Sequence, residues 1–240
     1  HPNVSQILGN MGAAAYLMRD SERAETYMVR SIEVDRRVLG PRHPDVGIGL
    51  GNLGRLHLER RRFTQARTLL DEGVAIQEEA LDPTRADLAM PLSNLALAYA
   101  GLGDDARAEP LFERSLKAAV ANEQAGLQGM ILTYLADLEC RTGRSDAGLR
   151  RVAASRPLLA RDYPDDPWRM AYADNVRAGC LTGLRRYPEA QQLIETSLPL
   201  VLARWPAATL YGRASLDRSR LLFTRTANAA KLAELAALAR

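Results

Sequence analysis

The segment HPDVGIGLGNLG at residues 43–54 decides the fold, because the chain repeats its pattern at a fixed spacing. The pentapeptide LGNLG at 50–54 matches LGNMG at 8–12 and LSNLA at 92–96, and each copy begins 42 residues after the one before. The dipeptide His-Pro also stands at both 1–2 and 43–44. A period of this length indicates a chain of similar units that stack on one another.

Each repeat is predicted to be a pair of helices. In the second repeat, Leu50, Leu53 and Leu56 follow a helical period, and a second such run lies between residues 66 and 74. Turn-forming segments separate the two runs at 20–21, 62–64 and 103–104 of successive repeats. Small residues mark where the paired helices should approach closely: Gly12, Gly54 and Ala96 in the first helices, and Ala24, Ala66 and Ala108 in the second helices.

The later chain follows the same plan less regularly. Pro167 and Asn175 are separated by 8 residues, as are Pro44 and Asn52. The interval from Asn175 to Ala190 is 15 residues, against 14 from Asn10 to Ala24, which predicts one extra residue in the turn of that hairpin.

The fold class is therefore predicted to be all-α, a right-handed α-solenoid of about six helical hairpins. No Gly/Ser-rich or Pro-rich linker interrupts the sequence, so residues 1–240 are predicted to form one solenoid domain. The expected units cover residues 1–42, 43–84, 85–122, 123–164, 165–206 and 207–240.

Composition excludes several classes of protein. The 32 basic and 29 acidic residues are interspersed, so the net charge of +3 gives little sign of a nucleic-acid partner. No apolar run approaches the roughly 20 residues of a membrane span, so we expect no membrane partner. Cys140 and Cys180 form neither a CxxC motif nor a recognisable disulfide framework, which predicts a reduced, cytoplasmic protein.

The motifs of common enzymes are not found in the sequence. His57 stands alone in a predicted helix and is interpreted as a packing or surface residue, because no Cys or second His lies at metal-binding spacing. The alternating glycines at 47–51 lie inside a helix, which excludes a phosphate-binding loop. No GxSxG motif is present. We therefore expect no enzymatic activity, no cofactor and no metal.

The quoted motifs resemble the tetratricopeptide repeat family in its longer, 42-residue form, found in kinesin light chains and many bacterial multidomain proteins. The resemblance is strong over residues 1–121 and looser over 122–240. The chain departs from the family pattern at Arg85-Ala86, where His-Pro is expected, so the start of that helix is expected to be less well defined.

This resemblance implies that the first helices line a groove for an extended or helical peptide. The implied peptide-binding or partner-binding residues are Asn10, Asn52, Arg55, Asn94, Tyr134 and Asn175; further groove positions would be Gln6, Ala13, Ile48, Glu59, Met90, Leu97, Met130, Asp137 and Asp174. An asparagine amide both donates and accepts, and can pair with a peptide backbone. The alternative is that each asparagine braces the second helix of its own repeat.

The function favoured by this interpretation is a non-enzymatic interaction scaffold, the recognition or regulatory part of a larger bacterial protein. Family members that bind chaperone tails clamp a carboxylate with Lys and Arg, whereas here only Arg55 is cationic, which disfavours that ligand. The alternative function is a small-molecule sensor for an attached catalytic domain or transcription factor. A sealed cavity would favour the sensor, and an open furrow with repeated asparagines favours a peptide.

The two ends of the sequence give one more expectation. Residue 1 is His, and the last predicted helix, 229–238, is rich in Ala and Leu. A solenoid needs polar terminal helices. The chain is therefore expected to be cut from a longer one. Either a further domain or repeat of the longer protein covers the C-terminal helix, or the fragment self-associates through it by way of Leu235 and Leu238.

Overall fold

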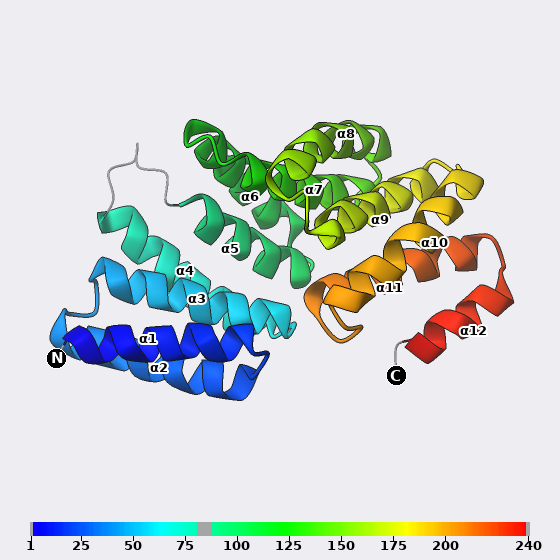
Figure 1. The fold of residues 1–240 in the computed structure, drawn as a ribbon. Helices are drawn as coiled ribbons and strands as arrows, with labels where there is room; N and C mark the ends of the chain where they lie inside the picture. Colours follow the sequence, from blue (N-terminus) through cyan, green and yellow to red (C-terminus); the bar gives the residue numbers. More distant parts are fainter. Residues whose placement is uncertain (1, 81–87, 239–240) are drawn as a thin grey trace. The chain divides into compact units, whose positions relative to one another are not determined.

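The computed structural model describes residues 2–80 and 88–238, and every regular element in those two ranges is an α-helix (Figure 1). The first six helices are α1 (Pro2–Leu17), α2 (Ser21–Val38), α3 (Pro44–Glu59), α4 (Phe63–Ala80), α5 (Ala89–Gly101) and α6 (Asp105–Ala121). The others are α7 (Ala125–Arg141), α8 (Ser145–Asp162), α9 (Pro167–Gly183), α10 (Tyr187–Arg204), α11 (Leu210–Arg225) and α12 (Ala229–Leu238). The helices follow one another as six hairpins, which confirms the prediction of an all-α helical repeat array.

Each hairpin turn has the same three-residue geometry. The middle residue has a positive φ in all six turns, and the hairpins from α5 to α6 and from α7 to α8 use Gly103 and Gly143 there. Glycine adopts this conformation without the steric cost that a Cβ brings. The other four turns place an ordinary L-residue in the same conformation: Arg19, Arg61, Arg185 and Ala227.

Small residues lie where the paired helices approach most closely, as predicted. Ala24, Ala66 and Ala108 are fully buried in the second helices. A Cβ added to Gly54 would lie 2.6 Å from Cγ of Leu70, so α3 and α4 leave no room for a larger side chain at this point.

The fifth hairpin, α9 and α10, has one residue more than the second hairpin, α3 and α4. The prediction that this residue lies in the turn is wrong, because it lies in helix α9. Helix α9 has 17 residues against 16 in α3, while both hairpin turns have three. As a result, Asn175 precedes the buried Ala178 by three residues, whereas Asn52 precedes Gly54 by only two. Residues three apart share one face of a helix, and residues two apart do not.

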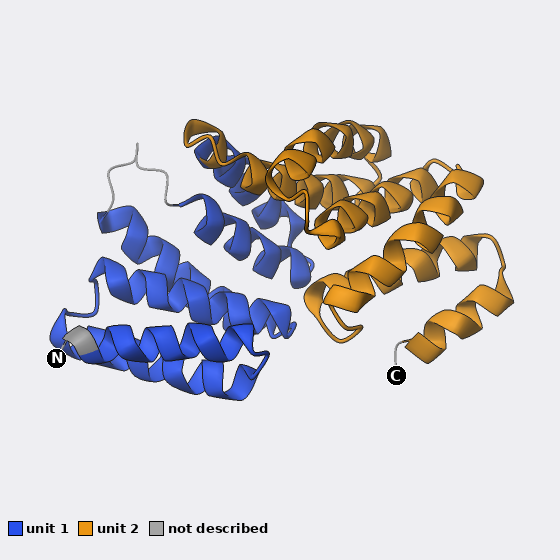
Figure 2. Ribbon diagram, in the orientation of Figure 1, with its two compact units in different colours: residues 1–118 blue, residues 119–240 orange. Residues whose placement is uncertain are grey.

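The chain divides into two compact units, residues 1–118 and residues 119–240 (Figure 2). In unit 1 the core is built by apolar residues of α1 to α4, among them Met28, Leu50 and Ile76. In unit 2 a core of α9 to α12 gathers Ile194, Leu216 and Phe223. The prediction of a single solenoid domain over residues 1–240 stays a prediction.

The prediction that the two cysteines are unpaired is wrong. Cys140 of α7 and Cys180 of α9 form a disulfide, with their Cα atoms 4.9 Å apart. Forty residues separate them in the sequence, but α7 and α9 are first helices of consecutive hairpins and pack side by side. Disulfides belong to oxidising environments. Cysteine usage therefore no longer supports a reduced, cytoplasmic setting.

Two further expectations concern the joins and the C-terminus. The Arg85-Ala86 departure lies outside the described residues, and α5 begins at Ala89 without a side-chain cap. The expectation that the last helix exposes Leu235 and Leu238 is wrong for Leu235, which is buried in the core of unit 2. Leu238 is exposed.

None of the helices in the described part of the chain is long and apolar enough to span a membrane.

Candidate functional site

Unit 1 holds an open pocket between the first helices α3 and α5. Its volume is about 290 Å³. Three of the predicted site residues, Asn52, Arg55 and Asn94, lie together in it, and Ile48 and Met90 flank them with 53% of each side chain exposed. We call this the amide pocket; its lining is Pro44, Ile48, Gly51, Asn52, Arg55, Gln77, Met90, Pro91 and Asn94.

The inner wall of the amide pocket is formed by a residue that the sequence did not suggest. Gln77 of α4 is only 5% exposed, yet it lines the pocket. It passes two glycines of α3: a Cβ on Gly47 would lie 3.0 Å from Cγ of Gln77, and a Cβ on Gly51 would lie 3.9 Å from its Nε2. The glycines at 47 and 51, one helical turn apart, were the available signal in the sequence. They leave space for an amide that reaches the pocket from the second helix.

The charge of Arg55 is already matched inside unit 1. Its Nη1 donates to the hydroxyl of Tyr16 at 2.8 Å and lies 3.6 Å from Oε1 of Glu59, and its guanidinium carbon lies 4.5 Å from the centre of the Tyr16 ring. Tyr16 in turn donates to Glu59. Burial, together with the Glu59 carboxylate, raises the pKa of Tyr16 to about 12. Arg55, Tyr16 and Glu59 thus form a half-buried group that carries no net charge.

The asparagines of unit 1 are accessible. Asn10 on α1 and Asn52 on α3 are exposed, and Asn94 on α5 is half-buried at the pocket. Asn10 lies outside the amide pocket. None of the three is enclosed between the two helices of its own hairpin. The structure therefore does not show the bracing arrangement for these three asparagines, and their role in a peptide-binding groove stays a prediction.

Asn175 in unit 2 has the opposite environment. It is 0% exposed, its Nδ2 donates to Oγ of Ser197 on α10 at 3.5 Å, and its Oδ1 accepts from Nε of Arg218 on α11 at 2.8 Å. This is the bracing arrangement. A partner cannot reach Asn175 while unit 2 keeps this packing.

Tyr134 is also inside unit 2. It is 7% exposed, its hydroxyl lies 2.8 Å from that of Tyr211, and its ring packs on Tyr172 and Tyr211 with centroids 6.4 Å away in each case. Burial raises the pKa of Tyr134 well above its ordinary value. Trp168, which is buried, and Trp205, which is half-buried, complete the aromatic cluster, with ring centroids 5.5 Å apart.

Arg218 of α11 ties the first helices of unit 2 together. Its Nη1 lies 2.6 Å from Oδ1 of Asp137 on α7, and its guanidinium carbon lies 5.0 Å from the centre of the Tyr172 ring on α9. Because it also donates to Asn175, one side chain joins α7, α9 and α11. The predicted groove positions of unit 2 are therefore largely occupied by the chain's own α11.

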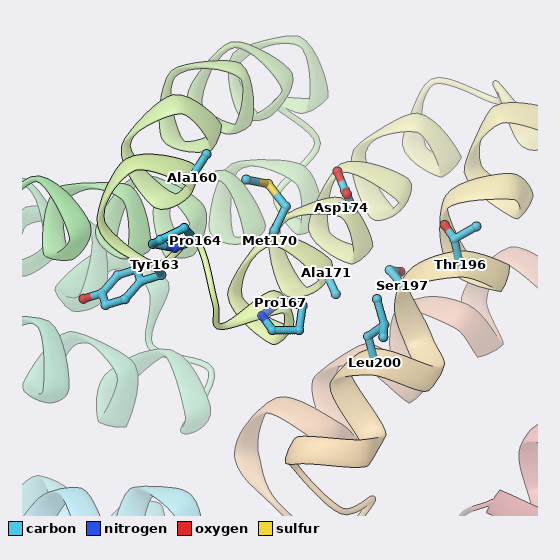
Figure 3. A pocket seen from close by; sticks show the side chains of 10 residues that line it. All are labelled: Ala160, Tyr163, Pro164, Pro167, Met170, Ala171, Asp174, Thr196, Ser197 and Leu200. Carbon is cyan, nitrogen blue, oxygen red and sulfur yellow. The ribbon is translucent and has the colours of Figure 1, made fainter.

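Unit 2 also contains a hollow, with a volume of about 500 Å³. It is bounded by the C-terminal end of α8, by α9 and by α10 (Figure 3). Met170, Ala171 and Asp174 line it from α9, and Thr196, Ser197 and Leu200 line it from α10. Asp174 is ion-paired with Arg156 of α8, and burial raises the pKa of its carboxyl group. Asp174 and Asn175 thus face different neighbours, although both were expected in one groove.

The described residues show no arrangement suited to metal binding. No group of three or more His, Cys, Asp or Glu side chains comes together among residues 2–80 and 88–238. His57 is buried on α3, 3.6 Å from the carboxylate of Glu25, and burial lowers its pKa. Of the two alternatives left by the sequence, packing or surface, the burial of His57 agrees with packing.

Comparison with known proteins agrees with the hairpin architecture. The tetratricopeptide repeat model matches residues 3–79 and 50–119. No curated protein sequence matches the chain significantly. Similar solved structures include the Podosopora anserina putative kinesin light chain with nearly identical TPR-like repeats, at 16% identity and a TM-score of 0.64, covering 85% of this chain and 98% of that one. BtubC (BKLC) from P. vanneervenii is similar at 18% identity and a TM-score of 0.61, covering 91% of this chain and 89% of that one. At these identities the structural likeness speaks for the fold alone. The family match therefore places residues 3–119 in the tetratricopeptide repeat family, and the chain as a whole has the fold of such repeat arrays.

Proposed function

We propose that unit 1 is a non-enzymatic docking surface, which binds an extended peptide or a segment of a partner protein along the first helices α1, α3 and α5. The observation that carries the proposal is the amide pocket, where Asn52 and Asn94 of consecutive repeats face one opening. Neither side-chain amide has a hydrogen-bond partner among the described residues. Each can therefore both donate to and accept from a peptide backbone.

The fold supports this proposal in general terms. Tetratricopeptide repeats generally serve as protein-interaction scaffolds, and a stacked array offers a long surface whose exposed residues can vary while the interior pattern is kept. The pocket is open, because Ile48, Asn52 and Met90 are exposed. A small-molecule sensor would enclose most of its ligand. The geometry therefore favours the peptide over the small ligand.

The test is a binding measurement with a variant that removes both amides. A random peptide library displayed on phage is selected on the full chain, and affinities of the selected peptides are measured for Asn52→Ala/Asn94→Ala. We expect a loss of about 1–3 kcal/mol in binding free energy, the range for lost hydrogen bonds, with the unfolding midpoint nearly unchanged.

The matched control is Gln65→Ala, which removes an exposed amide of α4 that does not line the pocket. It should leave both affinity and stability unchanged. If no peptide can be selected, or if the double variant binds as tightly as the control, the proposal is wrong. A parallel fall of affinity and stability in the double variant would instead assign both asparagines a structural role.

A further inference from the structure

The structure also indicates the chemistry of the ligand, an inference that depends on the proposed function. We infer that the amide pocket binds an uncharged peptide segment, which places one apolar side chain between Ile48 and Met90 and pairs its backbone amides with Asn52, Asn94 and Gln77. Acidic and basic segments would be discriminated against. Three features of unit 1 support this assignment.

The first feature is the scarcity of charge on the first helices. The sequences of α1 and α5, PNVSQILGNMGAAAYL and AMPLSNLALAYAG, contain no Asp, Glu, Lys or Arg. Arg55 is the one charged residue in the pocket lining, and Glu59 already lies 3.6 Å from it. A ligand carboxylate would compete with Glu59 for Arg55, and a ligand ammonium would find no carboxylate in the lining. Either charge would lose water without a new partner, which is costly.

The second feature is the apolar flank. Ile48 on α3 and Met90 on α5 project from facing helices and are each 53% exposed, while Pro44 and Pro91 extend the same apolar lining. Covering exposed apolar groups gains free energy in proportion to the apolar area that a ligand removes from water. Met90 is unbranched and adapts to different shapes. An apolar side chain of the ligand therefore gains free energy here, whereas a charged one does not.

The third feature is the set of amides. Asn52, Asn94 and Gln77 each offer donors and an acceptor but no charge. Gln77 is held in place by burial against α3, beside Gly47 and Gly51, so its amide loses little conformational freedom when a ligand binds. Three amides facing one opening match the alternating N–H and C=O groups of an extended peptide backbone.

The ligand chemistry is tested on peptides selected from the display library. From one selected peptide, variants are synthesised in which the central apolar residue becomes Ser, or a flanking residue becomes Asp or Lys, and their affinities for the full chain are measured at low and high salt. We expect each variant to bind about tenfold more weakly, and the parent affinity to change by less than about twofold with salt, because screening acts on charges.

The site is confirmed with a steric block. Gly51→Leu places a helix-forming side chain in the pocket next to Gln77 and should abolish binding. The control Gln65→Leu adds the same side chain at an exposed position of α4 that does not line the pocket, and should leave binding unchanged. Circular dichroism melting of both variants verifies that they fold, and Gln77→Glu, which adds one charge with almost no change of shape, should weaken binding about tenfold.

The outcomes separate the two proposals. If peptides bind and Gly51→Leu blocks them, but the selected sequences are charged and bind more weakly in high salt, the inferred ligand chemistry is wrong and the docking function stands. If no peptide binds, or if Gly51→Leu binds normally, the docking function itself is wrong and the inference fails with it. Neutral, apolar peptides that require Gln77 support both.

Discussion

The same helical face is open in unit 1 and filled in unit 2. In unit 1 the first helices expose Asn10 and Asn52 and surround the amide pocket. In unit 2 the corresponding face is covered by Arg218 and Tyr211 of α11, and Asn175 is fully buried beneath them. The same hairpin plan thus leaves this face open in one half of the chain and fills it with an interior network in the other.

The difference teaches that helical register decides the role of a repeated residue. The one extra residue in α9 rotates Asn175 by about 100° relative to Ala178, the close-contact position of that helix. An asparagine that points away from the second helix in unit 1 therefore points toward it in unit 2. Both tryptophans of the chain, Trp168 and Trp205, belong to unit 2, so tryptophan fluorescence can follow that unit in tests of this contrast.

The largest expected effect is loss of the disulfide in unit 2. Replacing Cys140 and Cys180 with Ser removes a link that closes a loop with a sequence separation of 40. The chain-entropy relation gives a destabilisation of about 4 kcal/mol for a loop of that size. Urea unfolding followed by tryptophan fluorescence should show it, and reduction of the unmodified chain should reproduce it. A fluorescence midpoint unaffected by either change would contradict the assignment of a disulfide to folded unit 2.

The next effect concerns the arginine that fills the face of unit 2. Arg218→Met keeps the aliphatic length but leaves Asp137 and Asn175 without their donor. Breaking a buried pair costs about 3–5 kcal/mol, and since the Asp137 side chain is 26% exposed, we expect about 3 kcal/mol.

The matched control is Arg213→Met on the same helix, whose partner Asp217 is exposed. It should cost less than about 1 kcal/mol. Equal fluorescence midpoints for the two variants would mean that Arg218 does not hold the first helices of unit 2 together.

A smaller effect should be shared by the two units. Ala66 of α4 and Ala190 of α10 are both fully buried at the closest helix contact of their hairpins. Leucine at either position overpacks that contact and should cost about 1–3 kcal/mol. Circular dichroism measures the first variant and tryptophan fluorescence the second, with the exposed Ala153→Leu of α8 as control. If one of the two buried alanines tolerates leucine, the hairpins do not share a common packing plan.

The smallest effect is a pH dependence of unit 2. Burial raises the pKa of Tyr134 and Tyr172 above the ordinary value of 10.0. Above pH 10 the unfolded chain therefore loses these protons before the folded chain does, and the unfolding free energy falls by up to about 1.4 kcal/mol per pH unit for each tyrosine. Fluorescence-detected urea midpoints should decrease as the pH rises above 10. Tyr134→Phe should make that decrease less steep, and an unchanged slope would mean that Tyr134 ionises freely.

Much of the architecture could be predicted from the sequence because the pattern of apolar and small residues recurs in each of the first three repeats. The 42-residue spacing indicated the helical hairpins of the first three repeats, and the small residues Gly54 and Ala66 indicated the contact between their helices. The same spacing predicted that Asn52 and Asn94 occupy equivalent points of successive repeats, and both line the amide pocket. These features are local, so periodicity alone reveals them.

The remaining features depend on partners far apart in the sequence. Gln77 reaches the pocket through a gap left by glycines 26 and 30 residues earlier, and Cys140 meets Cys180 only because two helices stack. Arg218 belongs to the last and least regular hairpin, where no repeated pattern marks it. For Asn175 a signal was present: counting back from Ala178, instead of forward from Pro167, gives the buried register.

The central claim is that register makes Asn52 a surface residue and Asn175 a structural one. The most direct test is the unfolding free energy of Asn52→Ala and Asn175→Ala, measured in urea by circular dichroism together with tryptophan fluorescence. Asn175→Ala removes the hydrogen bonds to Oγ of Ser197 and from Nε of Arg218 and should lose about 1–3 kcal/mol, whereas Asn52→Ala should stay within about 0.5 kcal/mol of the unmodified chain. Equal losses in the two variants, or a larger loss for Asn52→Ala, would contradict the claim.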